Sequence, residues 1–239
     1  MRLFTGTSGF SYKEWKGSFY PADLPASGML AFYAARFPTV EINNTFYRMP
    51  TETQLRQWAE QVPAGFRFVL KAPQRITHHR RLKEVGEEWG YFSRTAAVLG
   101  AGLGPILVQL PPNMKCDVAR LDDFFSIVPP EQRIALEFRH RSWLDDHVYD
   151  LLRRYRAALC VAHGELDETP PVLATASWGY ARLRNVEYSG QELRAWAERL
   201  AAAAWDEVFV FFKHEDAGTG PRLAAEFEQL FPPGNPGLR

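Results

Sequence analysis

The chain has 239 residues, of which 46% are hydrophobic and 23% are charged, which is the usage of an ordinary globular protein. Its 28 basic residues balance 28 acidic residues, so the formal net charge is zero. A protein that binds polyanions over a broad face is usually basic overall, so the composition disfavours nucleic-acid binding while leaving room for a local basic patch.

Nothing in the sequence predicts an exported or membrane-bound protein. No run reaches the roughly 18 consecutive apolar residues that a membrane helix needs. The first residues, MRLFTGTSGF, lack the apolar segment of a signal peptide. The two cysteines, Cys116 and Cys160, are most simply explained as reduced thiols. We therefore expect a cytoplasmic protein that makes no membrane contact, and the sequence leaves its oligomeric state open.

Eight short runs rich in apolar or β-branched residues recur along the chain, each followed by turn residues. They are Leu3–Thr7, Thr39–Asn43, Phe66–Ala72, Ile106–Leu110, Ile134–Arg139, Ala158–Ala162, Tyr180–Arg184 and Val208–Lys213. Runs of this length and composition are typical of buried strands.

Between most of these runs the apolar residues repeat every three to four positions, which is the period of an amphipathic helix. Seven such stripes begin at Leu30, Leu55, Trp89, Val118, Val148, Leu193 and Leu223. Thr51 with Gln54, and Ser189 with Glu192, have the spacing of a capping box at a helix start. The segment Gly164–Ser177 is the exception, because it shows no helical stripe.

Strands that alternate with helices predict an α/β protein with a parallel sheet. Eight repeats, in a chain close to the about 250 residues typical of such folds, favour a (β/α)8 TIM-like barrel. We expect a single domain over residues 1–239 with an irregular sixth β/α unit. An open doubly wound sheet is the competing architecture.

The predicted strands end in polar residues, and a barrel collects its chemistry at these ends. Because side chains alternate across a strand, Glu41 and Asn43 share one face of the second strand. Glu137 and Arg139 share a face of the fifth in the same way. The other polar strand ends are Lys71, Gln109, Arg182, Arg184 and Lys213. We expect all these side chains to point into one wet, concave mouth.

The predicted mouth holds five basic side chains against two acidic ones. A locally cationic mouth on a neutral protein predicts an anionic ligand, most simply a phosphate or a carboxylate. The alternative is that these charges form salt-bridged layers that plug the top of the barrel, because structural ion networks also occur in such folds.

The loops around the mouth each allow two interpretations. The first loop, Thr7–Pro25, contains Tyr12 among many aromatic and glycine residues, and is either a binding loop or an aromatic plug. The third loop, Gln74–Lys83, contains His78 in a basic run, which either grips phosphates or is a solvated charge run. His140 closely follows the fifth strand, where an imidazole could move protons.

The sequence predicts no metal site and no particular cofactor. Glu41, Glu137, His140, His163 and His214 could converge from different strands, but they have no metal-ligand spacing. Neither a dinucleotide-binding glycine motif nor a phosphate-binding P-loop follows any predicted strand.

Five motifs lie in order along the chain. They are Gly6-Thr7-Ser8-Gly9-Phe10-Ser11-Tyr12-x-x-Trp15, Glu41-Ile42-Asn43-Asn44-Thr45-Phe46-Tyr47-Arg48, Lys71-Ala72-Pro73 with Ile76-Thr77-His78, Gly104-Pro105-Ile106-Leu107-x-Gln109-Leu110-Pro111-Pro112, and Glu137-Phe138-Arg139-His140-x-Ser142-Trp143. With these motifs the chain resembles the YecE-like family, domain of unknown function 72. The resemblance implies a TIM-like barrel and supplies no established activity.

The chain departs from this family pattern at two strand ends. The seventh strand of the family usually ends in histidine and glycine, where this chain has Arg184 and Asn185. The eighth usually ends in a pair of asparagines, where this chain has Lys213 and His214. The extra cations shift the expected ligand toward greater negative charge.

Our leading hypothesis is an enzyme that acts on a small anionic substrate by general acid–base chemistry at the mouth. The catalytic candidates are Glu41, Glu137 and Lys71, and the substrate-binding candidates are Asn43, Gln109, Arg139, His140, Arg182, Arg184, Lys213, Tyr12 and His78. One alternative is a nucleic-acid or nucleotide-binding protein, including a metal-assisted phosphodiesterase. Another is a Schiff-base enzyme that uses Lys71 or Lys213.

Overall fold

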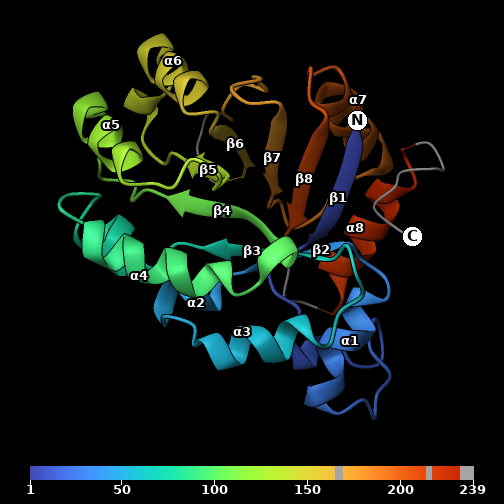
Figure 1. Ribbon diagram of the computed structural model, residues 1–239. Coiled ribbons are helices and arrows are strands. Elements are labelled where there is room, and N and C mark those ends of the chain that lie inside the picture. Colours follow the sequence, from blue (N-terminus) through green and yellow to red (C-terminus); the bar gives the residue numbers. More distant parts are fainter. Residues whose placement is uncertain (165–168, 214–216, 232–239) are drawn as a thin grey trace.

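Eight parallel strands form one sheet in the computed structural model of the chain (Figure 1), which describes residues 1–164, 169–213 and 217–231. The strands are β1 (Arg2–Thr7), β2 (Thr39–Ile42), β3 (Arg67–Lys71), β4 (Leu103–Gln109), β5 (Ile134–Glu137), β6 (Ala158–His163), β7 (Trp178–Leu183) and β8 (Glu207–Phe212). Their order is β1-β8-β7-β6-β5-β4-β3-β2. From β2 to β8 every strand therefore lies beside the next one along the chain, and β8 lies beside β1, as in a (β/α)8 barrel.

The barrel nearly closes between β1 and β2. Ser8 and Glu41 form a parallel bridge just beyond β1, and the Gly9 N–H donates to the Glu41 carbonyl oxygen at 2.8 Å. The predicted TIM-like barrel is confirmed. The competing open doubly wound sheet is wrong, because that architecture requires a reversal of strand order that this sheet does not have.

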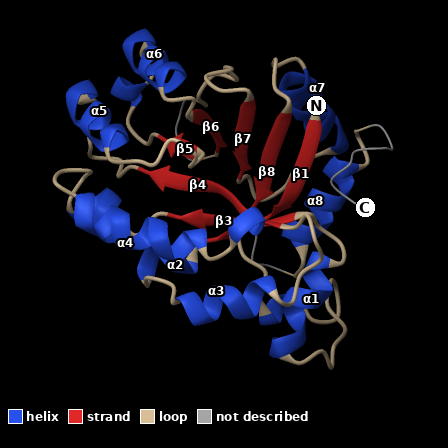
Figure 2. Cartoon of the chain, viewed as in Figure 1, coloured by secondary structure: helices blue, strands red, loops and turns tan. Residues whose placement is uncertain are grey.

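The helices lie outside the strands (Figure 2). They are α1 (Met29–Ala34), α2 (Asn44–Tyr47), α3 (Glu52–Ala59), α4 (Gly86–Ala97), α5 (Val118–Ser126), α6 (Asp146–Arg154), α7 (Gly190–Ala201) and α8 (Thr219–Glu228). Short 3₁₀ turns span Lys13–Trp15, Ala26–Gly28, Gly100–Gly102 and Arg141–Trp143, and a π turn spans Arg75–His79.

All seven predicted helical stripes are helices, and α2 is an addition that the sequence pattern did not indicate. Ser189 and Glu192 form the full capping box at the start of α7. The Thr51 hydroxyl accepts from the Gln54 N–H at the start of α3. Between β6 and β7 the described residues contain no helix, so the irregular sixth unit is confirmed as well.

Alternation along the strands sorts the apolar side chains into two layers. Leu136 and Phe138 of the fifth run pack outward, in the layer beneath the helices. The barrel interior is built from Phe4, Val69, Leu107, Ala135, Ala158, Cys160, Ala162, Trp178, Tyr180, Phe209 and Phe211. Ala135 of β5 and the inward side chains of β6 are small, so the long side chains of β7 have room to cross the barrel.

No helix in the described parts of the chain has both the length and the apolar character needed to cross a bilayer.

Gly6 lets β1 lie against β2 at the closing seam of the barrel. A Cβ atom at this position would lie 2.2 Å from the carbonyl oxygen of Thr39 and 2.9 Å from the hydroxyl oxygen of Tyr33. Both groups are buried, so the seam must open to accept any side chain.

We therefore expect Gly6→Ala to lower the free energy of unfolding by about 1–3 kcal/mol, the usual cost of overpacking. Urea unfolding of the purified protein measures it. Gly86→Ala is the matched control, because nothing lies within 4 Å of a Cβ at Gly86. Equal urea midpoints for the two variants would show that the seam is not tightly packed.

Candidate functional site

An ion-paired layer closes the C-terminal end of the barrel interior. Arg182 of β7 donates from Nη2 to Glu41 Oε1 at 2.7 Å and from Nη1 to Glu137 Oε2 at 2.5 Å. The exposed fractions of Glu41 and Glu137 are 0%, and that of Arg182 is 1%. One guanidinium therefore joins carboxylates from β2 and β5 across the barrel, out of contact with water.

Further donors complete the coordination of both carboxylates. Glu41 accepts from the hydroxyls of Tyr180 at 2.6 Å and Ser8 at 2.7 Å. Glu137 accepts from Gln109 Nε2 at 2.7 Å and from Arg139 Nε at 2.9 Å. Buried charges are stable only when they are paired and hydrogen-bonded in this way.

These contacts correct the expectation of a wet mouth for five of its members, because Gln109 and Lys71 are also buried, with exposed fractions of 4% and 8%. Glu41, Glu137 and Arg182 are buried, and for them the alternative of a salt-bridged layer describes the geometry. Burial, the largest single effect, raises the pKa of each glutamate, but the Arg182 guanidinium and the other donors around the carboxylates together outweigh it and hold both pKa values below the ordinary range. Both carboxylates are therefore ionised at neutral pH and have no exposed oxygen that could exchange protons with a ligand.

Lys71 lies at the edge of this layer, at the end of β3. Its Nζ donates to Gln109 Oε1 at 2.9 Å and lies 4.1 Å from the centre of the Phe46 ring. Only 8% of the residue is exposed. Burial, followed by the charge of Arg182, lowers the pKa of Lys71 to about 7. About half of this amine is therefore neutral at physiological pH, in contrast to an ordinary lysine.

His78 approaches the same corner from the π turn after β3. Its ring packs edge-on against Phe46, with 4.9 Å between ring centres, and its Nδ1 lies 2.8 Å from the Thr77 hydroxyl. Burial, then the charges of Lys71 and Arg139, lower the pKa of His78 to about 4. The imidazole is neutral at pH 7 and acts there as a hydrogen-bonding group without charge.

Hydrogen bonds join most of the predicted site residues into one continuous chain. In order of contact it runs Lys71, Gln109, Glu137, Arg182, Glu41 and Asn43, with Arg139 attached to Glu137. The structure thus brings together side chains from β2, β3, β4, β5 and β7. We refer to these seven residues as the mouth network.

The remaining predicted residues lie around the mouth network or have local roles. His140 accepts from the Ser142 N–H and caps the 3₁₀ turn Arg141–Trp143. Arg184 is half-buried, and its charge contributes to the low pKa of Glu137. Lys213 follows β8 and is half-buried. His214 lies outside the described residues.

Two members of the site were missed by the sequence analysis. Tyr180 lies two positions before Arg182 on the same face of β7, so alternation along the strand was a usable signal. Ser8 lies in the motif after β1, where nothing local indicates that its hydroxyl reaches Glu41.

A cavity of about 380 Å³ lies beside the mouth network, next to Asn43. It is lined by Gly9, Phe10, Ser11, Tyr12, Ala26, Ser27, Leu30, Ile42, Asn43, Asn44, Trp58 and Gln61. This is a size that small-molecule ligands use. Its lining combines aromatic rings with hydroxyl and amide groups and includes no charged side chain.

The interpretation of the first loop as an aromatic plug describes part of it, and a binding role for the rest stays a prediction. Trp15 and Tyr20 are buried and pack with Phe19 as an aromatic plug. Phe10 and Tyr12 line the cavity instead, and the Tyr12 hydroxyl donates to the Ser8 carbonyl oxygen at 2.7 Å.

The basic run of the third loop forms ion pairs at the surface. Arg75 and Arg80 contact Glu88 of α4 at 3.1 and 3.5 Å, and Arg81 donates to Asn113. This arrangement favours the interpretation of the basic run as solvated surface charges over its interpretation as a phosphate-binding loop. Within residues 1–164, 169–213 and 217–231, no group of three or more His, Cys, Asp or Glu side chains is placed to hold a metal ion.

We expect Arg182→Met to lower the free energy of unfolding by about 3–5 kcal/mol, because it leaves two buried carboxylates without their shared cation. Arg222→Met is the matched control: Arg222 pairs with Glu226 on the exposed face of α8, and such pairs contribute about 0–1 kcal/mol. Urea unfolding at pH 7 measures both. A loss of the same size in the two variants would contradict a structural role for the buried layer.

Known proteins resemble this chain over nearly its whole length. A family model described as "Protein of unknown function DUF72" matches residues 4–236. The UPF0759 protein YunF of Bacillus subtilis (strain 168) is 26% identical over 231 residues, which cover 89% of this chain and 78% of YunF.

Two solved structures are similar in fold. The DUF72 family protein TM1631 of Thermotoga maritima matches with a TM-score of 0.85 and 28% identity, over 96% of this chain and 99% of that one. The DUF72 family protein EF0366 of Enterococcus faecalis matches with a TM-score of 0.78 and 21% identity, over 96% and 94% of the two chains. None of these descriptions names a substrate or a reaction.

Proposed function

The chain belongs to the DUF72 family of proteins of unknown function, and we propose that it is an enzyme acting on a small anionic substrate at the C-terminal end of its barrel. The substrate carries a carboxylate or a phosphate, Lys71 transfers the proton, and Arg139 holds the anion. The observation that carries the proposal is the Lys71 amine, which is mostly buried beside an ion-paired layer and has a pKa of about 7.

Lys71 suits proton transfer better than either glutamate. A general acid or base works best when its pKa is close to the operating pH, and this holds for the lysine. Glu41 and Glu137 are ionised and enclosed by donors. We therefore assign the two glutamates a positioning role, in which Glu137 orients Gln109 and Gln109 orients the Lys71 amine.

The charge of the mouth network favours an anion. With Lys71 protonated, the network contains three basic and two acidic side chains, and Arg184 adds a further positive charge nearby. The Arg139 side chain is 22% exposed and donates from Nε to Glu137, so a ligand can approach its guanidinium from the solvent side. An anion that binds there also favours the protonated form of Lys71, which couples binding to proton uptake.

The neighbouring cavity extends the site beyond the anionic group. Asn43 belongs both to the mouth network and to the cavity lining. Trp58 and Phe10 offer aromatic faces, and Gln61 offers an amide. We assign to this cavity an uncharged planar or hydroxylated part of the same substrate.

We expect Lys71→Met to lower kcat by about 10²–10⁴-fold on any substrate found by screening small carboxylic acids and phosphate monoesters, which is the usual contribution of a proton-transferring side chain. The wild-type rate rises as the pH increases through about 7, because Lys71 loses its proton over this range. Anion affinity falls over the same range, because the positive charge is lost. Activity assays measure the turnover rate and calorimetry measures the anion affinity, both across pH 5.5–8.5, a window of about 1.5 pH units on either side of the pKa.

Lys115→Met is the matched control, since Lys115 is exposed. It should leave both trends unchanged. A Lys71→Met protein that stays folded and retains wild-type turnover would exclude Lys71 as the proton-transferring group.

The same amine supports a Schiff-base enzyme as a second candidate. A neutral lysine attacks a carbonyl carbon, and loss of water then leaves an imine. Borohydride adds hydride to that imine and leaves a stable secondary amine on Lys71. Mass spectrometry after incubation with carbonyl acids detects this adduct. Its absence at Lys71, together with turnover of a substrate, favours proton transfer.

The nucleic-acid alternative loses its two supports from the sequence. The aromatic first loop is largely packed inward, and two arginines of the basic run are paired with Glu88. Few aromatic faces and few basic groups of these two loops are left for bases and phosphates.

A further inference from the structure

A second cluster of basic side chains lies at the opposite, N-terminal end of the barrel. Arg2 and Arg67 are the first residues of β1 and β3, and Arg133 directly precedes β5. They stand two positions before the interior residues Phe4, Val69 and Ala135. Because side chains alternate along a strand, the three arginines are directed toward the barrel axis from three alternate strands.

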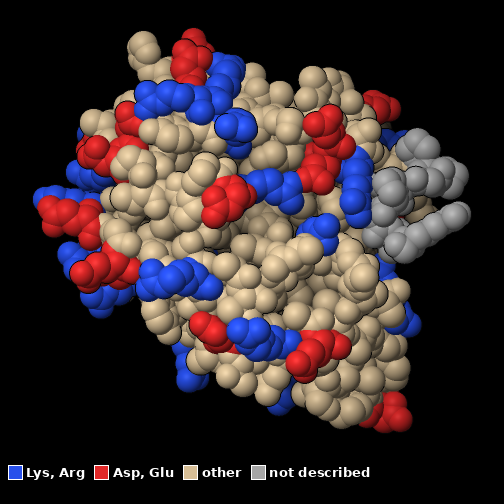
Figure 3. Space-filling view, viewed as in Figure 1, with Lys and Arg blue, Asp and Glu red and all other residues tan. Residues whose placement is uncertain are grey.

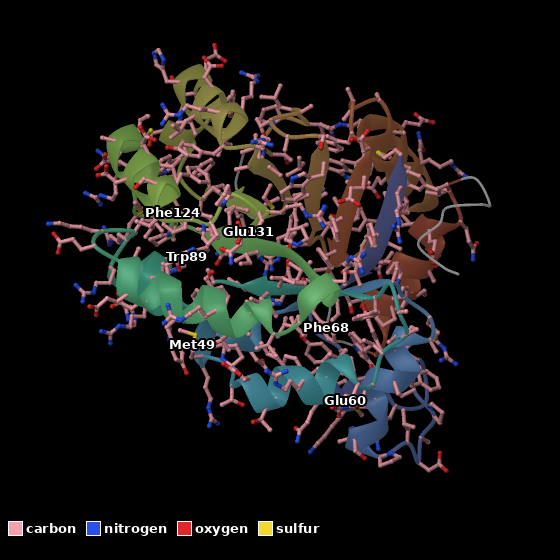
Figure 4. The ribbon with its side chains drawn as sticks, in the orientation of Figure 1. Met49, Glu60, Phe68, Trp89, Phe124 and Glu131 are labelled. Carbon is pink, nitrogen blue, oxygen red and sulfur yellow. The ribbon has the colours of Figure 1, made fainter. Side chains whose placement is uncertain are left out.

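This end of the barrel is visible in the space-filling view. Glu131, labelled in Figure 4, lies in the loop that leads into β5. The same face in Figure 3 shows basic and acidic side chains next to one another around a central hollow. The Arg133 side chain is 32% exposed, so solutes can reach the cluster from solvent.

Aromatic rings hold two of the guanidinium groups in place. Arg2 Cζ lies 4.4 Å from the centre of the Phe4 ring. Arg133 Cζ lies 5.4 Å from the Trp178 ring and 5.3 Å from the Phe209 ring. Stacked guanidinium groups lose little further freedom when they bind, so the donors of these two arginines are pre-organised.

The cluster contains more positive than negative charge. Glu207 is the one acidic side chain that pairs with it among the described residues, through Arg133. Glu131 and Asp206 are nearby in sequence, and no ion pair joins either of them to the three arginines in these parts of the chain. Arg2 Nε is buried without a hydrogen-bond partner there. Burial and then the charge of Arg67 lower the pKa of Arg133 to about 10, so these like charges disfavour one another.

We infer that Arg2, Arg67 and Arg133 form a binding site for a phosphate group at the N-terminal end of the barrel. Three arginines less one glutamate leave an excess of two positive charges, which matches the charge of about −1.5 to −2 on a phosphate monoester at pH 7. Guanidinium forks match phosphate oxygens in geometry and form strong charge-assisted hydrogen bonds with them. The site is separate from the mouth network and does not depend on the proposed function.

Calorimetric titration with inorganic phosphate, at fixed ionic strength in a chloride buffer, tests this inference. We expect wild-type protein to bind phosphate and Arg67→Met to bind it about tenfold or more weakly, because a charge-assisted donor is lost. Glu207→Gln should bind phosphate more tightly than wild type, because it removes the carboxylate that pairs with Arg133. Absence of binding to wild type, or equal binding by wild type and Arg67→Met, would overturn the inference.

Two further variants separate this site from other effects. Lys71→Met alters only the mouth network. If this variant still binds phosphate, and if the double variant with Arg67→Met binds it more weakly, the phosphate binds at the N-terminal end of the barrel. Arg222→Met removes an exposed arginine of α8 and should bind phosphate as wild type does. If Arg67→Met does not fold, the phosphate affinity of Glu207→Gln is the test of the inference. An affinity equal to that of the wild type would refute the site.

Discussion

The bridge from Arg182 to Glu41 and Glu137 is the constraint on which the C-terminal half of the barrel depends. Moving three charges out of water is expensive, and only close pairing with complete hydrogen bonding offsets this cost. The bridge therefore requires β2, β5 and β7 to keep their relative positions, because a shift of any one strand exposes a charge or separates it from its partner. Tyr180, Ser8 and Gln109 donate further hydrogen bonds to the two carboxylates, whereas Arg182 Nε is buried without a hydrogen-bond partner among the described residues.

The buried bridge also determines the chemistry of the residues around it. Its positive centre lies close enough to Lys71 to disfavour protonation, while burial of the amine has the larger effect in the same direction. The glutamates that would ordinarily serve as acid or base are already committed to Arg182. For this reason we propose the proton-transferring role for Lys71, at the edge of the buried layer, and not for the carboxylates. At the opposite end of the barrel, Arg2, Arg67 and Arg133 lie together, and Glu207 pairs with Arg133.

Local patterns were sufficient for much of this molecule. The period of the apolar residues placed all eight strands and seven helices, and alternation placed Glu41 with Asn43 and Glu137 with Arg139 on inward faces. The short helix α2 escaped because four residues are too few to show a period. The sequence pattern also did not predict how deeply each strand-end residue is buried. The local sequence around a glutamate is the same whether its side chain faces solvent or lies beneath Arg182, because burial depends on the neighbouring strands.

The sequence by itself determined the order of strands and helices, their inward and outward faces and the polar residue types at the C-terminal strand ends, because these follow from interactions between residues a few positions apart. Only the tertiary structure decided which charges pair. Arg182 and Glu41 are 141 positions apart and Arg182 and Glu137 are 45 apart, so no local pattern links them. Pairing and burial are properties of the closed barrel, and they distinguish the carboxylates enclosed around Arg182 from the Lys71 amine, whose pKa burial lowers.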